Sequence, residues 1–148
     1  MKNLKQVQGF LNNIPNINSG GCGIAALAIY RWLKQNNQLT KDTKFVYYYF
    51  SEDRSEISYN HYLNNSNVLE NNNGEPEACA HAGIYYRRKY LDSNGKIDTW
   101  KFEHDHYVNE KFIVNSINNL GCWNSSFERS HIGEIEDRLN IKLNDIYN

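Results

Sequence analysis

The amino-acid sequence predicts a single domain, spanning residues 1–148, with an α+β fold. Three observations support this prediction: an apolar segment of helical length at 22–35, a series of short aromatic and β-branched segments between 44 and 107, and two amphipathic segments at 110–120 and 130–139. A chain of 148 residues is large enough to bury a hydrophobic core without disulfide bonds. We therefore expect the helix at 22–35 to pack on an antiparallel sheet, with further helices near the C-terminus.

The N-terminal region predicts two helices. Residues 3–13 carry apolar side chains at helical spacing, and Pro15 ends this short amphipathic helix. The segment 22–35 follows Gly20-Gly21 and is apolar around most of its circumference, which is typical of a buried helix. Ser19 lies just before this segment and is the expected N-cap, because its hydroxyl can accept a hydrogen bond from an unpaired backbone N–H.

Four segments rich in aromatic and β-branched residues predict strands: 44–50, 78–86, 89–92 and 97–107. Arg87-Arg88 separates the second of these strands from the third, and Ser93-Asn94-Gly95 separates the third from the fourth. The Asn-Gly pair favours a tight hairpin turn, because glycine adopts positive φ without strain. We therefore expect the last three strands to be neighbours in an antiparallel meander.

The segment 51–77 is polar and interrupts the strand pattern. Seven asparagines fall between Asn60 and Asn73. Connections of this length inside a domain are uncommon unless they are functional or disordered. We expect 51–77 to be a long mobile loop that borders the functional cleft.

The charge balance excludes some classes of partner. Lys and Arg number 16, Asp and Glu number 17, and the net charge is −1, so a dedicated binder of nucleic acid or anionic membranes is not expected. No apolar run approaches the roughly 20 residues of a membrane span, and the N-terminus has no signal-peptide block. The three cysteines are widely spaced and predict no disulfide framework. These features favour the cytoplasm, with no nucleic-acid or membrane partner.

Three residues form a candidate catalytic set. Cys22 begins the predicted buried helix, where unpaired N–H groups and the helix dipole favour a thiolate. His81 lies on a predicted strand among small neighbours, and Asp92 ends the adjacent strand, where it could hold the imidazole Nδ1–H. Nucleophile, base and orienting carboxylate are the parts of a catalytic triad. The simpler alternatives are an inert packing cysteine and an aspartate that serves only the turn, with Asn94 or Asp98 as substitutes for it.

An ion pair between Cys22 and His81 has a measurable consequence. Each charge stabilises the other, so we expect the imidazole pKa to rise above its ordinary value of about 6.5. The thiol is then expected to react with alkylating reagents even below neutral pH.

The strings NSGGCGIAALAIYRWL and HAGIYYRRKYLDSNG resemble two segments of the papain-like superfamily, which includes papain-type peptidases, bacteriocin-leader peptidases and transglutaminase-like enzymes. Both strings are also similar to small phage-encoded proteins, for which the host cytoplasm is the expected location. The resemblance covers residues 16–100. It implies a papain-like fold, with Cys22 as nucleophile, His81 as base and Asp92 as the residue that orients it.

The oxyanion donor departs from the papain pattern. Papain-type enzymes place a glutamine a short way before the cysteine, whereas this sequence has Asn16 and Asn18 in that region. Gln6 and Gln8 lie further away along the chain. Asn16 and Asn18 are therefore the candidates for the side-chain oxyanion donor, beside the backbone N–H of Cys22.

The function expected from these residues is thiol-dependent hydrolysis or acyl transfer at an amide, either a peptide or an isopeptide bond. The substrate would be a protein or a peptide, and the reaction needs no cofactor and no metal. The sequence leaves the oligomeric state open.

Two other interpretations stay open. One is a non-catalytic phage structural or host-interaction module that keeps the fold. The other is a zinc protein in which His104 and His106, two residues apart on a strand, share a third ligand from elsewhere. The candidates for that third ligand are Cys79, Cys122 and His131. Cys79 is also a weaker candidate for the nucleophile, because it does not begin a helix.

Overall fold

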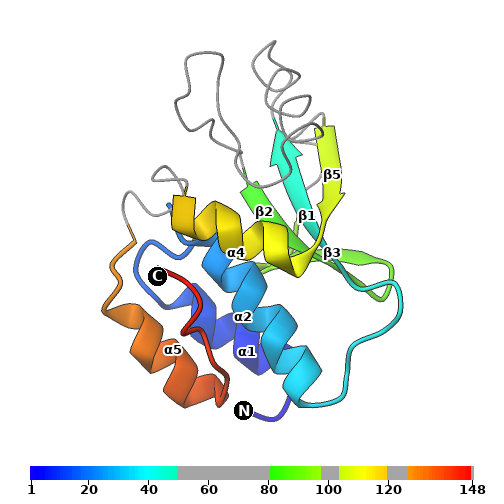
Figure 1. Ribbon diagram of the computed structural model, residues 1–148. Helices are drawn as coiled ribbons and strands as arrows, with labels where there is room; N and C mark the ends of the chain where they lie inside the picture. The colour runs from blue at the N-terminus through cyan, green and yellow to red at the C-terminus, as the bar shows by residue number, and fades with distance from the viewer. Residues whose placement is uncertain (50–80, 98–103, 120–126, 148) are drawn as a thin grey trace, which may run out of the picture.

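The computed structural model describes residues 1–49, 81–97, 104–119 and 127–147, and the expected loop at 51–77 lies outside this part of the chain. Within the described residues the protein has an α+β fold with four helices and a five-stranded sheet (Figure 1). The α+β prediction is therefore confirmed.

The four helices agree with the sequence prediction: α1 (Leu4–Asn12), α2 (Cys22–Gln35), α4 (Glu110–Asn119) and α5 (His131–Leu139). The prediction that Ser19 caps α2 is wrong, because the N-cap is Gly21 and no side chain caps this end. Gly21 passes so close to Ile17 and Phe127 that a Cβ atom would lie 2.8 Å from the Ile17 carbonyl oxygen and from the Phe127 ring. Only a residue without a Cβ atom fits at this N-cap position, and Ser19, two residues earlier, lies outside it.

The sheet is antiparallel and contains β1 (Lys44–Tyr49), β2 (His81–Tyr86), β3 (Lys89–Asp92), β4 (Gly95–Lys96) and β5 (His104–Val108). The strand order is β4-β3-β2-β1-β5. The prediction of one strand at 97–107 in a continuous meander is therefore wrong. β4 continues the meander for two residues, whereas β5 joins the opposite edge and pairs with β1. Strand periodicity specifies which face a residue occupies but not which neighbour the strand pairs with.

Both predicted hairpin turns are present. Arg87 and Arg88 connect β2 to β3 with φ angles of 47° and 64°, which is the left-handed geometry of a two-residue hairpin turn. Gly95 follows the next turn with a φ of 115°, a conformation that strains any residue with a Cβ atom. These two tight turns keep β2, β3 and β4 in register.

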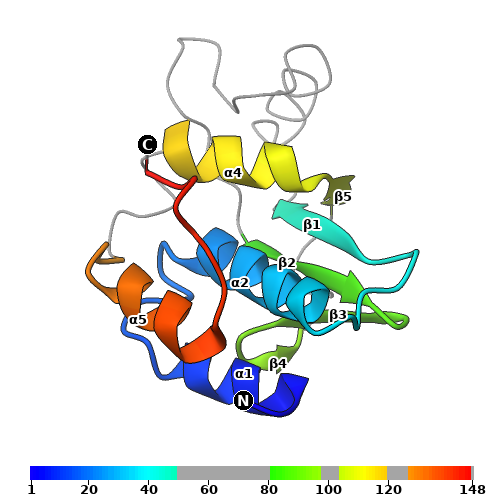
Figure 2. The ribbon, with the colours of Figure 1, turned by 60° about the horizontal axis from the view of Figure 1, so that its bottom comes forward.

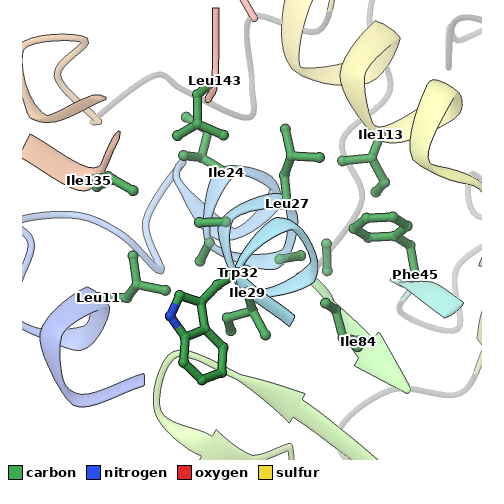
Figure 3. Packing of buried hydrophobic residues seen from close by; sticks show 14 of the residues in the cluster. Leu11, Ile24, Leu27, Ile29, Trp32, Phe45, Ile84, Ile113, Ile135 and Leu143 are labelled. Atoms are coloured by element: carbon green, nitrogen blue, oxygen red, sulfur yellow. The ribbon is translucent and has the colours of Figure 1, made fainter. Parts of the chain in front are cut away.

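Helix α2 occupies the centre of the molecule (Figure 2). It packs against β2 and β3 on one side and against α1, α4 and α5 on the others. Apolar side chains from all of these elements surround it, including Leu11, Phe45, Ile84, Ile113 and Ile135 (Figure 3). Its own residues from Gly23 to Ile29 are buried, which explains why the segment is apolar nearly all round.

The sheet has a second, smaller apolar cluster, separate from the core around α2. This cluster contains Val46, Tyr48 and Ile97, with Tyr85 and Tyr90 packed beside it. His81 is the direct cross-strand partner of Tyr48, and the two rings stack with centroids 6.3 Å apart. The sheet therefore supports the histidine with a buried aromatic ring.

None of the helices within the described ranges is long and apolar enough to cross a membrane.

Gly83 provides a test of this packing. A Cβ atom there would lie 2.4 Å from the Ile97 side chain and 2.6 Å from the Leu91 carbonyl oxygen. We expect Gly83→Ala to lower the free energy of unfolding by about 1–3 kcal/mol, the usual range for overpacking. Gly9→Ala is the matched control, because Gly9 lies in α1 with nothing within 4 Å of its Cβ position and alanine is the better helix former. Urea unfolding of both variants measures the difference, and a Gly83→Ala protein as stable as wild type would contradict the packing described.

Candidate active site

Cys22 is the first residue of α2 and carries a free thiol that is partly buried against the core. The first turn of a helix has backbone N–H groups without intrahelical partners, and the helix dipole is positive there. The position therefore favours negative charge on the sulfur and on any oxygen held beside it. Cys79 and Cys122 lie outside the described residues.

His81 is the first residue of β2, and its ring contacts both other members of the predicted set. Its Nε2 atom lies 2.7 Å from Oδ2 of Asp92, and both side chains are 13% exposed. The Cys22 side chain lies near enough to the His81 ring to interact with it and raise its pKa. The three residues predicted from sequence are thus brought together.

The ring nitrogen that faces Asp92 differs from the expectation. The sequence analysis assigned Nδ1 to the carboxylate, whereas the structure has Nε2 in that role. The order of residues along the chain does not specify the rotation of the ring, which packing around His81 decides.

Burial by itself lowers the pKa of His81, because an apolar environment disfavours the charged ring. The hydrogen bonds to Asp92 and Cys22, with the attraction of both groups, outweigh this effect and raise the pKa from 6.5 to about 9. His81 is therefore an imidazolium at neutral pH and loses its proton only as the pH rises through about 9. The direction of this shift is the one expected for a histidine beside a carboxylate and a thiol.

Asp92 uses its two carboxylate oxygens for different purposes. Oδ2 meets His81, while Oδ1 accepts a hydrogen bond of 2.8 Å from the backbone N–H of Asn94. The second bond is typical of an aspartate that begins a turn. Asp92 can therefore hold the turn and orient His81 at the same time. Asn94, which was considered as a substitute for Asp92, instead binds it through its backbone N–H. Asp98, the other substitute considered, lies outside the described residues.

The two asparagines expected at the oxyanion site lie in the loop before α2. Asn16 is exposed and has a φ of 61°. Asn18 donates its amide N–H groups to Ser93 Oγ at 2.9 Å and to Asn12 Oδ1 at 3.4 Å. An oxyanion role for Asn18 would compete with these two bonds.

Gln8, which lies further from Cys22 along the chain than the two asparagines, also contacts this region. Its Nε2 donates to the backbone carbonyl of Asp92 at 2.8 Å and, more weakly, to that of Gly95 at 3.4 Å. No sequence pattern indicates this contact, because it joins residues 84 positions apart on elements whose packing is tertiary.

Metal chemistry finds no support in the described part of the chain, where no group of three or more His, Cys, Asp or Glu side chains is arranged to hold an ion. Among the zinc ligands considered, His131 begins α5 and packs near the Phe127 ring. Cys79, Cys122 and the side chains of His104 and His106 lie outside the description.

A cavity of about 1040 Å³ lies between α2, α4, α5 and the C-terminal segment. Its lining includes Arg31 and Lys34, from the half of α2 opposite to Cys22. Arg31 bridges Glu110 at 3.1 Å and Asp145 at 2.6 Å, which ties the C-terminal segment to α2 and α4. This cavity is separate from the Cys22–His81–Asp92 site.

The sequence matches no protein-family model and no curated protein, and the structure matches no solved structure.

The charge state of His81 can be measured directly. We expect its Cε1–H resonance to titrate with a midpoint near pH 9 in wild type, assigned by comparison with His81→Gln. Asp92→Asn and Cys22→Ser should each lower the midpoint, because each removes a partner that stabilises the imidazolium. In the double variant only burial remains, so the midpoint should fall below 6.5. A wild-type midpoint near 6.5 would show that the three side chains do not interact in solution.

Proposed function

We propose that the protein is a thiol-dependent hydrolase or acyl transferase that acts on a peptide or isopeptide bond. One observation carries this proposal: His81 is hydrogen-bonded to Asp92 and interacts with the side chain of Cys22, and Cys22 begins the central helix. This is the arrangement of nucleophile, base and orienting group that covalent amide hydrolysis requires.

In the proposed reaction His81 takes the proton of the Cys22 thiol, or already holds it in an imidazolium–thiolate pair. The thiolate attacks the carbonyl carbon of the amide, and the carbonyl oxygen becomes an oxyanion that the backbone N–H of Cys22 can stabilise. The imidazolium of His81 then protonates the amide nitrogen, the C–N bond breaks, and an amine leaves. The product on the protein is a thioester at Cys22.

The second half of the reaction restores the thiol site. Water or an acceptor amine gives a proton to the neutral His81 and attacks the thioester carbonyl. The C–S bond breaks, and the thiolate leaves beside the imidazolium. Asp92 remains ionised throughout and stabilises the imidazolium whenever it forms.

The arrangement also supports a place in the papain-like superfamily. A cysteine at the start of a central helix is followed by a histidine and an aspartate on neighbouring antiparallel strands, in the order which the sequence resemblance implies. On this proposal the substrate is a protein or a peptide.

The first test is alkylation of Cys22 with iodoacetamide across a range of pH, read by mass spectrometry of the peptide that contains Cys22. We expect fast labelling below neutral pH in wild type, because the thiolate is held by an imidazolium. His81→Ala should move the pH profile of labelling toward that of an ordinary thiol, which has a pKa of about 8.5. A wild-type profile equal to that of an ordinary thiol and unchanged in His81→Ala would favour a non-catalytic module.

A second test measures turnover on a mixed library of peptide aminomethylcoumarin amides, with amine acceptors added. Cys22→Ala should melt like wild type but lose turnover by roughly 10³-fold or more, since the covalent route is removed. Cys79→Ser and Cys122→Ser are the matched cysteine controls and should retain turnover. Full turnover in a folded Cys22→Ala protein would exclude Cys22 as the nucleophile.

A further inference from the structure

Two side chains from the N-terminal region hold the turn that follows Asp92. Gln8 comes from α1, and Asn18 comes from the loop between α1 and α2. Gln8 bonds to the backbone of the turn, and Asn18 bonds to Ser93, the residue next to Asp92. We call Gln8, Asn18 and Ser93 the turn clamp.

The Gln8 contact holds both ends of the turn. Its Nε2 lies 2.8 Å from the carbonyl oxygen of Asp92 and 3.4 Å from that of Gly95. Its neighbour Val7 is fully buried in the core, as is Leu11 one turn later. Core packing of α1 thus fixes the base of the Gln8 side chain, and the amide reaches outward to the turn.

The Asn18 contact is reciprocal. The Ser93 hydroxyl donates to Asn18 Oδ1 at 3.1 Å and accepts from Asn18 Nδ2 at 2.9 Å. Ser93 is only 2% exposed, so these bonds satisfy a buried polar group. Asn18 lies in the short loop that leads to Gly21 and Cys22, so the same loop precedes the thiol and holds the aspartate turn.

The turn is also held by the Asn94 N–H bond to Asp92 and by the pairing of β3 with β4. β4 contains only two residues, however, and lies at the edge of the sheet. The Asp92 carboxylate must nevertheless stay within hydrogen-bond distance of His81, and a displacement of about 1 Å would lengthen the 2.7 Å contact beyond that range. A neutral amide such as that of Gln8 suits this position, because it donates to carbonyl oxygens without adding a charge that competes for Asp92 or His81.

We propose that Gln8 and Asn18 are positioning residues, which hold the turn so that the Asp92 carboxylate stays against His81. The clamp joins α1, the loop before Cys22 and the β3–β4 turn, and so couples the placement of the thiol to the placement of the carboxylate. Its effect on turnover rests on the proposed function, whereas its effect on His81 does not.

The test compares Gln8→Met, Asn18→Ala and Ser93→Ala with Gln6→Met. Methionine matches glutamine in length but cannot donate, and Gln6 is an exposed residue of the same helix that bonds only near the N-terminus, to the Lys2 N–H. The readouts are thermal unfolding and the titration midpoint of His81 by NMR, where Asp92 and Cys22 are the charged groups that face the ring.

We expect Gln8→Met, Asn18→Ala and Ser93→Ala to lower the His81 midpoint to values between wild type and Asp92→Asn, because the carboxylate is held less firmly. The double variant Gln8→Met/Ser93→Ala should approach Asp92→Asn, and Gln6→Met should equal wild type. Where turnover is measurable, Gln8→Met should lower kcat by roughly 10-fold to 100-fold, as misplaced catalytic groups do, with little change in KM.

An unchanged midpoint in folded Gln8→Met and Ser93→Ala proteins would overturn the proposal. If Gln8→Met does not fold, the His81 midpoint of Asn18→Ala tests the proposal instead, because Asn18 is exposed and its removal leaves the core intact. If the turn-clamp variants shift the titration midpoint of His81 but wild-type Cys22 reacts as an ordinary thiol, the positioning role is supported. The proposed hydrolase function is then contradicted.

Discussion

Burial of α2 is the constraint on which the rest of the structure depends. The helix is surrounded by the sheet and three other helices, and most of its side chains from Ile24 to Leu33 are buried. Each large apolar side chain buried in this way contributes about 1.5–3 kcal/mol, so rotation or translation of the helix is strongly disfavoured. A fixed helix axis fixes its first residue, and that residue is Cys22.

The site adds electrostatics to this packing. A histidine buried as deeply as His81 would ordinarily lose its proton, yet its pKa is raised to about 9 because Asp92 and Cys22 meet the ring. The two partners come from different elements, α2 and β3, while the ring itself stands on β2 beside the Tyr48 ring. The charge on His81 therefore depends on tertiary packing, which brings Asp92 and Cys22 to the ring.

Local signals predicted much of this architecture. α2, β3 and the two hairpin turns follow from apolar pattern, from β-branched and aromatic content and from the Asn-Gly pair, all of which act within a few residues. The same signals failed where a choice depended on distant partners. Ser19 has the chemistry of an N-cap, but the N-cap is Gly21, where Ile17 and Phe127 leave no room for a Cβ atom. β5 has the composition of a strand, but its pairing with β1 depends on which sheet edge is open.

The candidate site divides in the same way. The sequence by itself determined which residue types are present and on which elements: a cysteine at a helix start, a histidine on a strand and an aspartate at a hairpin turn, because these depend on local propensity and spacing. Only the tertiary structure decided that the three side chains meet, that Nε2 and not Nδ1 faces Asp92, and that Gln8 and Asn18 hold the turn. The physical reason is that hydrogen bonds between side chains far apart in sequence form only after the core has fixed their backbones, and the amino-acid pattern carries no signal of that distance.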